Sequence, residues 1–240
     1  MAADEVVAPI YTPHIGESRQ YWRDIILGVN DGLVSTYLLV VGVIGGGMVM
    51  GDVLLTGIAG ALAGAVSMAA GEYLATKSQD EVLAAELSLE KEHLRDHREQ
   101  EVDQLRGFFS DMGVADEDLD GVVEAFDRSD EAMLNAMAAL EFGVVESERR
   151  SPFLAMAASG GLFLVGAMPS VVPFVIFDTT ATALTWASVL ALGSLFVVGV
   201  VKASVAKTNK VKSGLENLAI AGVGGVIAWV IGTAVGGTLA

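Results

Sequence analysis

Apolar residues run through this chain in five long stretches, and one extended polar segment separates the second stretch from the third. An α-helix rises about 1.5 Å per residue, so roughly 20 apolar residues are needed to cross about 30 Å of hydrocarbon. Each stretch reaches that length. We therefore predict membrane-spanning helices near residues 24–47, 53–75, 153–177, 182–203 and 215–239.

The polar segment, residues 77–150, is expected to form three amphipathic helices, over Ser78–Phe109, Asp116–Phe126 and Ser129–Val145. The first should continue out of the second span as one long helix, because helix formers dominate it and no proline or glycine precedes Gly107. The predicted fold class is an all-α membrane protein with five transmembrane helices and a three-helix domain inserted between the second and third spans. Its parts are a polar amino-terminal segment, two spans, the polar domain and three further spans, at residues 1–20, 21–76, 77–150 and 151–240.

Charge is concentrated in the polar domain. It holds 21 of the 30 Asp and Glu residues and 8 of the 14 Lys and Arg residues, and the whole chain has a net charge of −16. That sign is wrong for binding nucleic acid or anionic lipid and right for binding cations. Cysteine is absent, which excludes disulfides and thiolate metal sites.

The distribution of basic residues predicts an orientation in the membrane. If the amino terminus is cytosolic, all 14 basic residues lie on the cytosolic side, and the opposite side carries only Asp52 and Asp178 among charged residues. The positive-inside rule then places residues 77–150 in the cytosol and the carboxyl terminus outside it. Organelle-targeting features are not visible, so a prokaryotic plasma membrane and a vacuolar membrane both fit.

Potential metal ligands share one face of the first amphipathic helix. At about 100° per residue, this face collects carboxylates and imidazoles, at Glu86, Glu90, His93, His97 and Glu101. The third helix adds Met133, Met137 and Glu141 along one of its faces. Such ligands suit Fe²⁺, Mn²⁺ or Zn²⁺. A solvated acidic face and a halophilic surface are the alternative interpretations.

A second acidic pattern resembles a calcium-binding loop. Asp116, Asp118, Asp120, Gly121 and Asp127 fit that pattern except at the last position, which usually supplies a bidentate glutamate. The same residues equally suit the acidic first turn of a helix, where carboxylates favour the helix dipole.

Two carboxylates lie within or beside the predicted spans. Asp31 falls inside the first, and Glu72 lies near the cytosolic end of the second, with Met68 one helical turn away. A carboxylate at the centre of the bilayer costs at least about 2.5 kcal/mol, so these groups should face a polar pathway or a partner. Five spans leave little room for a pathway within one subunit, and we therefore expect a homodimer.

Several stretches resemble the vacuolar iron transporter (VIT/CCC1-like) family. They are Arg23-Asp-Ile-Ile-Leu-Gly-Val-Asn-Asp-Gly-Leu33, Ser67-Met-Ala-Ala-Gly-Glu-Tyr-Leu-Ala-Thr-Lys-Ser-Gln79 and the segment that contains Pro169 and Pro173. The resemblance implies a dimeric transporter, rather than an enzyme with a prosthetic group. It would export Fe²⁺, often also Mn²⁺, from the cytosol in exchange for protons, and a cytosolic domain would bind the metal.

The resemblance also implies roles for particular residues. Asp31 and Met68 match the membrane aspartate and methionine of the family's pathway, and Glu90, Glu101, Met137 and Glu141 match ligands of its cytosolic domain. The chain departs from the family's pattern at Gly60, His93, Gln104 and Ala138. These departures predict fewer bound ions, weaker binding or a different selectivity.

A membrane-bound di-iron carboxylate oxidase or an iron-storage protein is the rival interpretation. Glu90-x-x-His93 matches the Glu-x-x-His unit of di-iron bundles. Such centres need two of these units and further glutamates on four facing helices, whereas this chain has one unit.

Overall fold

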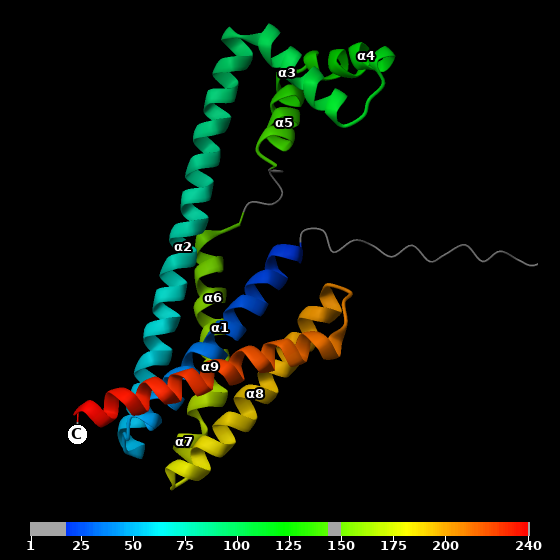
Figure 1. Ribbon diagram of the computed structural model, residues 1–240. Helices are drawn as coiled ribbons and strands as arrows, with labels where there is room; N and C mark the ends of the chain where they lie inside the picture. The colour runs from blue at the N-terminus through cyan, green and yellow to red at the C-terminus, as the bar shows by residue number, and fades with distance from the viewer. Residues whose placement is uncertain (1–17, 144–149, 240) are drawn as a thin grey trace, which may run out of the picture. The chain divides into compact units, whose positions relative to one another are not determined.

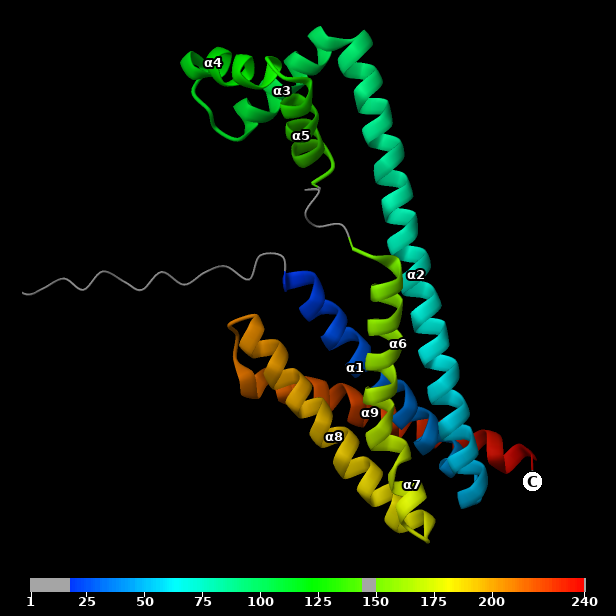
Figure 2. The same cartoon turned by 180° about the vertical axis from the view of Figure 1, so that it is seen from behind.

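The computed structural model describes residues 18–143 and 150–239, and within these ranges every regular element is a helix. The helices are α1 (Ser18–Gly45), α2 (Met50–Asp96), α3 (Arg98–Asp111), α4 (Asp116–Asp127), α5 (Asp130–Glu141), α6 (Pro152–Val171), α7 (Pro173–Ile176), α8 (Thr180–Val205) and α9 (Lys210–Leu239) (Figures 1 and 2). Five of them, α1, α2, α6, α8 and α9, are long and apolar enough to cross a membrane. The all-α, five-span prediction is therefore confirmed. Most of the predicted segment 1–20, and Val145 at the predicted end of the third amphipathic helix, lie outside the described residues.

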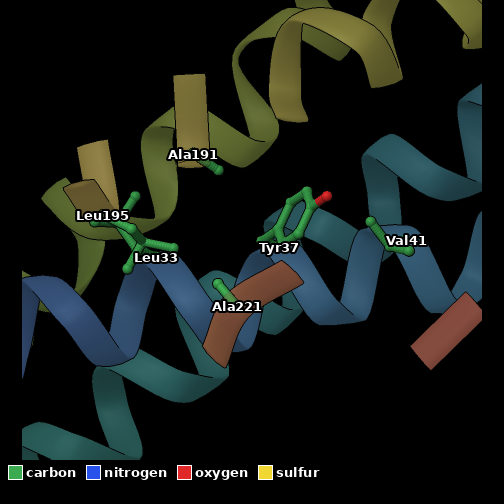
Figure 3. Close-up of a cluster of buried hydrophobic side chains, with 6 residues drawn as sticks. All are labelled: Leu33, Tyr37, Val41, Ala191, Leu195 and Ala221. Carbon is green, nitrogen blue, oxygen red and sulfur yellow. The ribbon is translucent and has the colours of Figure 1, made fainter. Parts of the chain in front are cut away.

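One compact unit contains α1, α2 as far as Ala65, and the chain from Ser159 onward. Its core forms where α1 packs against α8 and α9 (Figure 3). The stripe of Leu33, Tyr37 and Val41 on α1 meets Ala191 and Leu195 of α8 and Ala221 of α9. Residues spaced by four lie on one helix face, so Leu33, Tyr37 and Val41 form a continuous contact surface along α1.

Glycines allow the helices of this unit to approach backbone to backbone. A Cβ atom at Gly32 would overlap the carbonyl oxygen of Phe163, and one at Gly232 would overlap the carbonyl oxygen of Gly42. Small residues at helix contacts are typical of membrane bundles, where close van der Waals packing replaces the hydrophobic driving force.

The predicted third span is divided into two helices. α6 continues through Pro169 and ends at Val171, and α7 begins at Pro173. A proline has no N–H for the helical hydrogen bond, and its ring clashes with the preceding turn, which explains the break at Pro173. The span therefore ends earlier than the predicted limit of residue 177.

A second compact unit, Val66–Ala158, contains the rest of α2 and the helices α3, α4 and α5. Its core is formed by Leu94 of α2, Leu105 of α3, and Met133 and Met137 of α5. Arg98 at the start of α3 connects this helix to α4 and α5. Its Nε donates to Asp127 Oδ1 at 2.8 Å, and its Nη1 donates to Asp130 Oδ1 at 2.5 Å.

The prediction of one uninterrupted helix from Ser78 to Phe109 was wrong. The chain breaks at His97, which has φ −135° and ψ 30°, so α2 ends at Asp96 and α3 begins at Arg98. The backbone N–H of His97 still donates to the His93 carbonyl at 2.7 Å, and the His97 carbonyl accepts from the N–H of Gln100 at 2.9 Å. The break allows both Leu94 and Leu105 to be buried in one core, which a straight helix would prevent.

The acidic segment that resembles a calcium loop is helical. α4 begins at Asp116, and Asp116, Asp118 and Asp120 are exposed on its first turns. Asp120 pairs with Arg106 of α3. The alternative interpretation of this segment, an acidic first helical turn, is therefore the one that the structure supports.

The glycine contacts predict a position-specific loss of stability. Gly232→Ala should lower the thermal unfolding midpoint of the detergent-solubilised chain by roughly 5 °C, since overpacking a tight contact costs about 1–3 kcal/mol. Gly222→Ala is the matched control, because a Cβ at Gly222 meets open space in the same helix. Equal midpoints for the two variants would contradict the close packing of α9 on α1.

Candidate metal site

Three potential metal ligands converge where α2 meets α3. Glu90 and His93 lie on the last turns of α2, and Glu101 lies on the first turn of α3; one donor atom of each is within 4.8 Å of the others. His93 Nδ1 lies 3.3 Å from Glu101 Oε1. The three groups are close enough to bind a single ion.

The break at His97 is what makes this convergence possible. Glu90 and His93 are one helical turn apart and share a face in any helix. In a straight helix, however, Glu90 and Glu101 would be separated by roughly 16 Å along the axis, too far to bind the same ion. Because the chain changes direction after Asp96, Glu101 returns to the side of α2 that carries Glu90.

Both carboxylates of the cluster are buried without full hydrogen bonding. Glu90 and Glu101 are 4% and 5% exposed. Glu90 Oε1 and Glu101 Oε2 have no hydrogen-bond partner among the described residues. Buried polar atoms are normally paired, and an unpaired one carries a desolvation penalty. A divalent cation would satisfy both oxygens at once.

Electrostatics in the cluster favour either a proton or a cation. Burial, together with the neighbouring carboxylates of Glu101 and Glu141, raises the pKa of Glu90 from 4.5 to about 7, and His93 acts in the opposite direction. Two adjacent buried carboxylates cannot both ionise without a large repulsion. Below about pH 7, the metal-free cluster therefore retains a proton that a cation would replace.

The remaining predicted ligands surround this cluster. The ring of His97 packs edge-on against that of His93, with centroids 6.1 Å apart, but His97 is exposed and lies outside the three-residue group. Glu86 is exposed one turn before Glu90, and Glu141 is exposed at the end of α5. Their roles as ligands remain predictions.

The two methionines of α5 are part of the apolar core. Met133 and Met137 are each 0% exposed, and they pack with Leu94 and Leu105. A thioether is a weak ligand, and a buried methionine is an ordinary gap-filling residue. Whether Met133 and Met137 also bind metal stays a prediction.

The predicted pathway residues have different surroundings. Asp31 is exposed on α1, and its backbone carbonyl accepts a hydrogen bond from Ser35 Oγ at 2.5 Å. Met68 is half-buried on α2, one turn before Glu72. Glu72 forms an ion pair with Arg150, at 3.9 Å between its Oε1 and a guanidinium nitrogen. Arg150 was not predicted as a functional residue, although its position just before the predicted span 153–177 could have identified it as a possible partner for a carboxylate.

Comparisons with known proteins agree over nearly the whole chain. The model of the VIT family matches residues 22–233. Vacuolar iron transporter 2 of Oryza sativa subsp. japonica is 31% identical over 180 residues, covering 75% of this chain and 73% of the relative. Vacuolar iron transporter 1 of Arabidopsis thaliana is 27% identical over 207 residues, covering 86% and 83%. Protein CCC1 of Saccharomyces cerevisiae is 25% identical over 217 residues, covering 86% and 66%.

The raised pKa of Glu90 predicts a pH-dependent metal affinity. A carboxylate must lose its proton to bind metal, so affinity for Zn²⁺ or Co²⁺ should rise by up to tenfold per pH unit below pH 7 and level off above it. Calorimetric titration of the full chain in detergent, at several pH values, measures this profile. Glu90→Gln should weaken binding and remove the part of the pH dependence centred near 7, whereas Glu92→Gln, an exposed carboxylate two residues away, should change neither.

The same pKa predicts how metal-free protein responds to pH. The folded state holds the Glu90 proton more tightly than the unfolded chain, so the contribution of Glu90 to stability is greatest below about pH 4.5 and is lost as the pH rises to about 7. For the titration of metal affinity described above, an affinity that does not change with pH would contradict the raised pKa of the buried Glu90 carboxyl group.

Proposed function

The chain belongs to the VIT family, and we propose that it is a membrane transporter that exports divalent transition metal from the cytosol, with Fe²⁺ as the main substrate and Mn²⁺ as a second one. The observation that supports this most directly is the convergence of Glu90, His93 and Glu101 in a chain that matches the family over residues 22–233. The relatives are named vacuolar iron transporters, and five helices are suited to cross a bilayer. A metal transporter accounts for all of these features together.

We propose that the helices α3–α5 and the adjoining end of α2 collect the metal on the cytosolic side. The charge distribution supports this side, because the positive-inside rule places the basic residues and the acidic domain together in the cytosol. The negative charge of residues 77–150 would raise the local concentration of cations. Three ligand groups would leave further coordination positions to water, so the ion would be held and still be able to leave.

The ion would then enter the membrane through Met68 and Glu72 and be bound by Asp31 within the first span. Each carboxylate would hold either a proton or a metal ion, and this alternation would couple export to proton entry. The support is chemical: Asp31 and Glu72 place carboxylates within or beside the spans, and intramembrane carboxylates are typical of ion and proton pathways.

A homodimer would complete the pathway. Asp31 is exposed in a single chain, on a helix long and apolar enough to cross the bilayer. A carboxylate facing lipid is unfavourable, whereas a second copy packed against this face would surround it with protein. The proposed pathway therefore runs between subunits.

A di-iron oxidase receives less support. Within the described residues, one cluster of three carboxylate and imidazole ligands is present, which suffices for a single ion. A di-iron carboxylate centre needs two Glu-x-x-His units and additional glutamates.

Asp31→Ala should abolish or strongly reduce metal flux. The full chain is reconstituted into proteoliposomes, and initial rates of Fe²⁺ and Mn²⁺ movement are followed with an entrapped metal-sensitive dye under a proton gradient. Flux should fall by at least about tenfold, since loss of the charged ligand leaves the ion without compensation in the membrane. Asp52→Asn, an exposed carboxylate at the start of α2, is the control and should retain flux. Undiminished flux in Asp31→Ala would remove Asp31 from the pathway.

His93 is expected to set the order of metal preference. An imidazole nitrogen favours Fe²⁺ and Zn²⁺, whereas a site of oxygen ligands alone suits Mn²⁺ and Ca²⁺ better. His93→Glu should therefore raise the affinity for Mn²⁺ relative to Zn²⁺ by about tenfold in competition titrations of the full chain. His97→Glu is the matched control, because it introduces the same charge one turn away and outside the cluster. The same shift in both variants would mean that added charge, rather than the ligand at position 93, determines preference.

A further inference from the structure

An ion pair lies at the end of the second predicted span. Glu72 on α2 faces Arg150, the residue that comes two positions before α6 begins at Pro152. Both side chains are partly buried, at 20% exposure for Glu72 and 15% for Arg150, and 3.9 Å separates the carboxylate oxygen from the guanidinium nitrogen. Glu72 is one of the pathway residues expected from the sequence, whereas Arg150 has no role in that prediction.

The surrounding contacts hold the two residues opposite each other. The ring of Tyr73 packs against that of Phe153 at a centroid distance of 5.2 Å, so the residues adjacent to the ion pair also join α2 to the start of α6. Thr76, one turn beyond Glu72, is 5% exposed, and Ala155 on α6 is 3% exposed. Glu72 therefore lies on a packed face of α2, where its charge requires a counter-charge.

The pair is close but not tightly bonded. At 3.9 Å the two groups attract each other electrostatically, but the distance is too long for a hydrogen bond. Arginine forms its strongest carboxylate contacts through two short parallel hydrogen bonds, and this pair lacks them. A competing cation therefore has no strong hydrogen bond to break before it reaches the Glu72 carboxylate.

We propose that Arg150 is a built-in counter-ion for Glu72, which neutralises this carboxylate between transport events and must be displaced when a divalent metal ion arrives. This inference rests on the proposed function, in which Glu72 is part of the pathway. A divalent ion brings two charges to the carboxylate and the guanidinium brings one, so a divalent metal ion displaces Arg150 more readily than a monovalent cation does. Arg150 is thus a specificity-determining residue that lowers apparent affinity at the pathway entrance.

Metal flux into proteoliposomes tests this role. Arg150→Gln removes the competing charge, and the apparent KM for Mn²⁺ should fall by about twofold to fivefold, in keeping with the modest strength of partly exposed ion pairs. Arg150→Met, also neutral and of similar length, should give the same shift and guards against a folding defect specific to one variant. Arg150→Lys keeps the positive charge and should keep the KM within twofold of the original.

Lys77→Gln is the matched control for charge alone. Lys77 lies on the same helix and pairs with Glu81 at 3.6 Å, so the variant removes one positive charge near this end of α2 without touching the Glu72 pair. Its KM should not change. If both neutral variants at Arg150 leave KM unchanged or raise it, or if Lys77→Gln lowers KM equally, the counter-ion role is overturned.

The flux of the unaltered chain separates this inference from the proposed function. If the unaltered chain moves no Fe²⁺ or Mn²⁺, or if Glu72→Gln transports at the full rate, the proposed pathway fails and the counter-ion role fails with it. If the unaltered chain transports metal and Glu72→Gln does not, an unchanged KM in the Arg150 variants overturns the counter-ion role alone.

Discussion

The burial of two carboxyl groups side by side is the constraint on which the metal-binding proposal depends. Glu90 and Glu101 are almost fully buried, and each leaves an oxygen without a hydrogen-bond partner among the described residues. This arrangement is unfavourable unless a proton or a cation compensates it, as the raised pKa of Glu90 reflects. A site that is unfavourable when empty, and that either a proton or a cation stabilises, is suited to exchanging one for the other.

The apolar core and the salt bridges of the second compact unit maintain that arrangement. Leu94 and Leu105 meet Met133 and Met137 in one core, so the chain must turn between α2 and α3. Arg98, next to the turn at His97, holds the beginning of α3 against Asp127 and Asp130. Packing energy that is unrelated to metal binding thus places Glu101 beside Glu90. The ligands are positioned before any ion arrives, which reduces the conformational entropy lost on binding.

The membrane-spanning helices follow a different principle. Close contacts at Gly32 and Gly232 bring the helix backbones together. Asp31 is exposed on α1, whereas Glu72, in the other compact unit, is paired with Arg150. Each carboxylate within or beside the spans needs a partner, and the two find it in different ways: Glu72 has one within the chain, and for Asp31 we propose a second copy.

Hydrophobic periodicity by itself determined the all-α class, the five spans and the acidic helices between them, because helix length and amphipathicity are local properties of a sequence. It also identified Glu90, His93 and Glu101 as sharing one face, but it placed them on a straight helix, where Glu101 would have been too far from Glu90 to bind the same ion. Only the tertiary structure decided that the helix breaks at His97 and that Arg150 lies opposite Glu72. Both outcomes depend on contacts between residues distant in sequence, where the burial of Leu105 or the pairing of a charge outweighs local helix propensity.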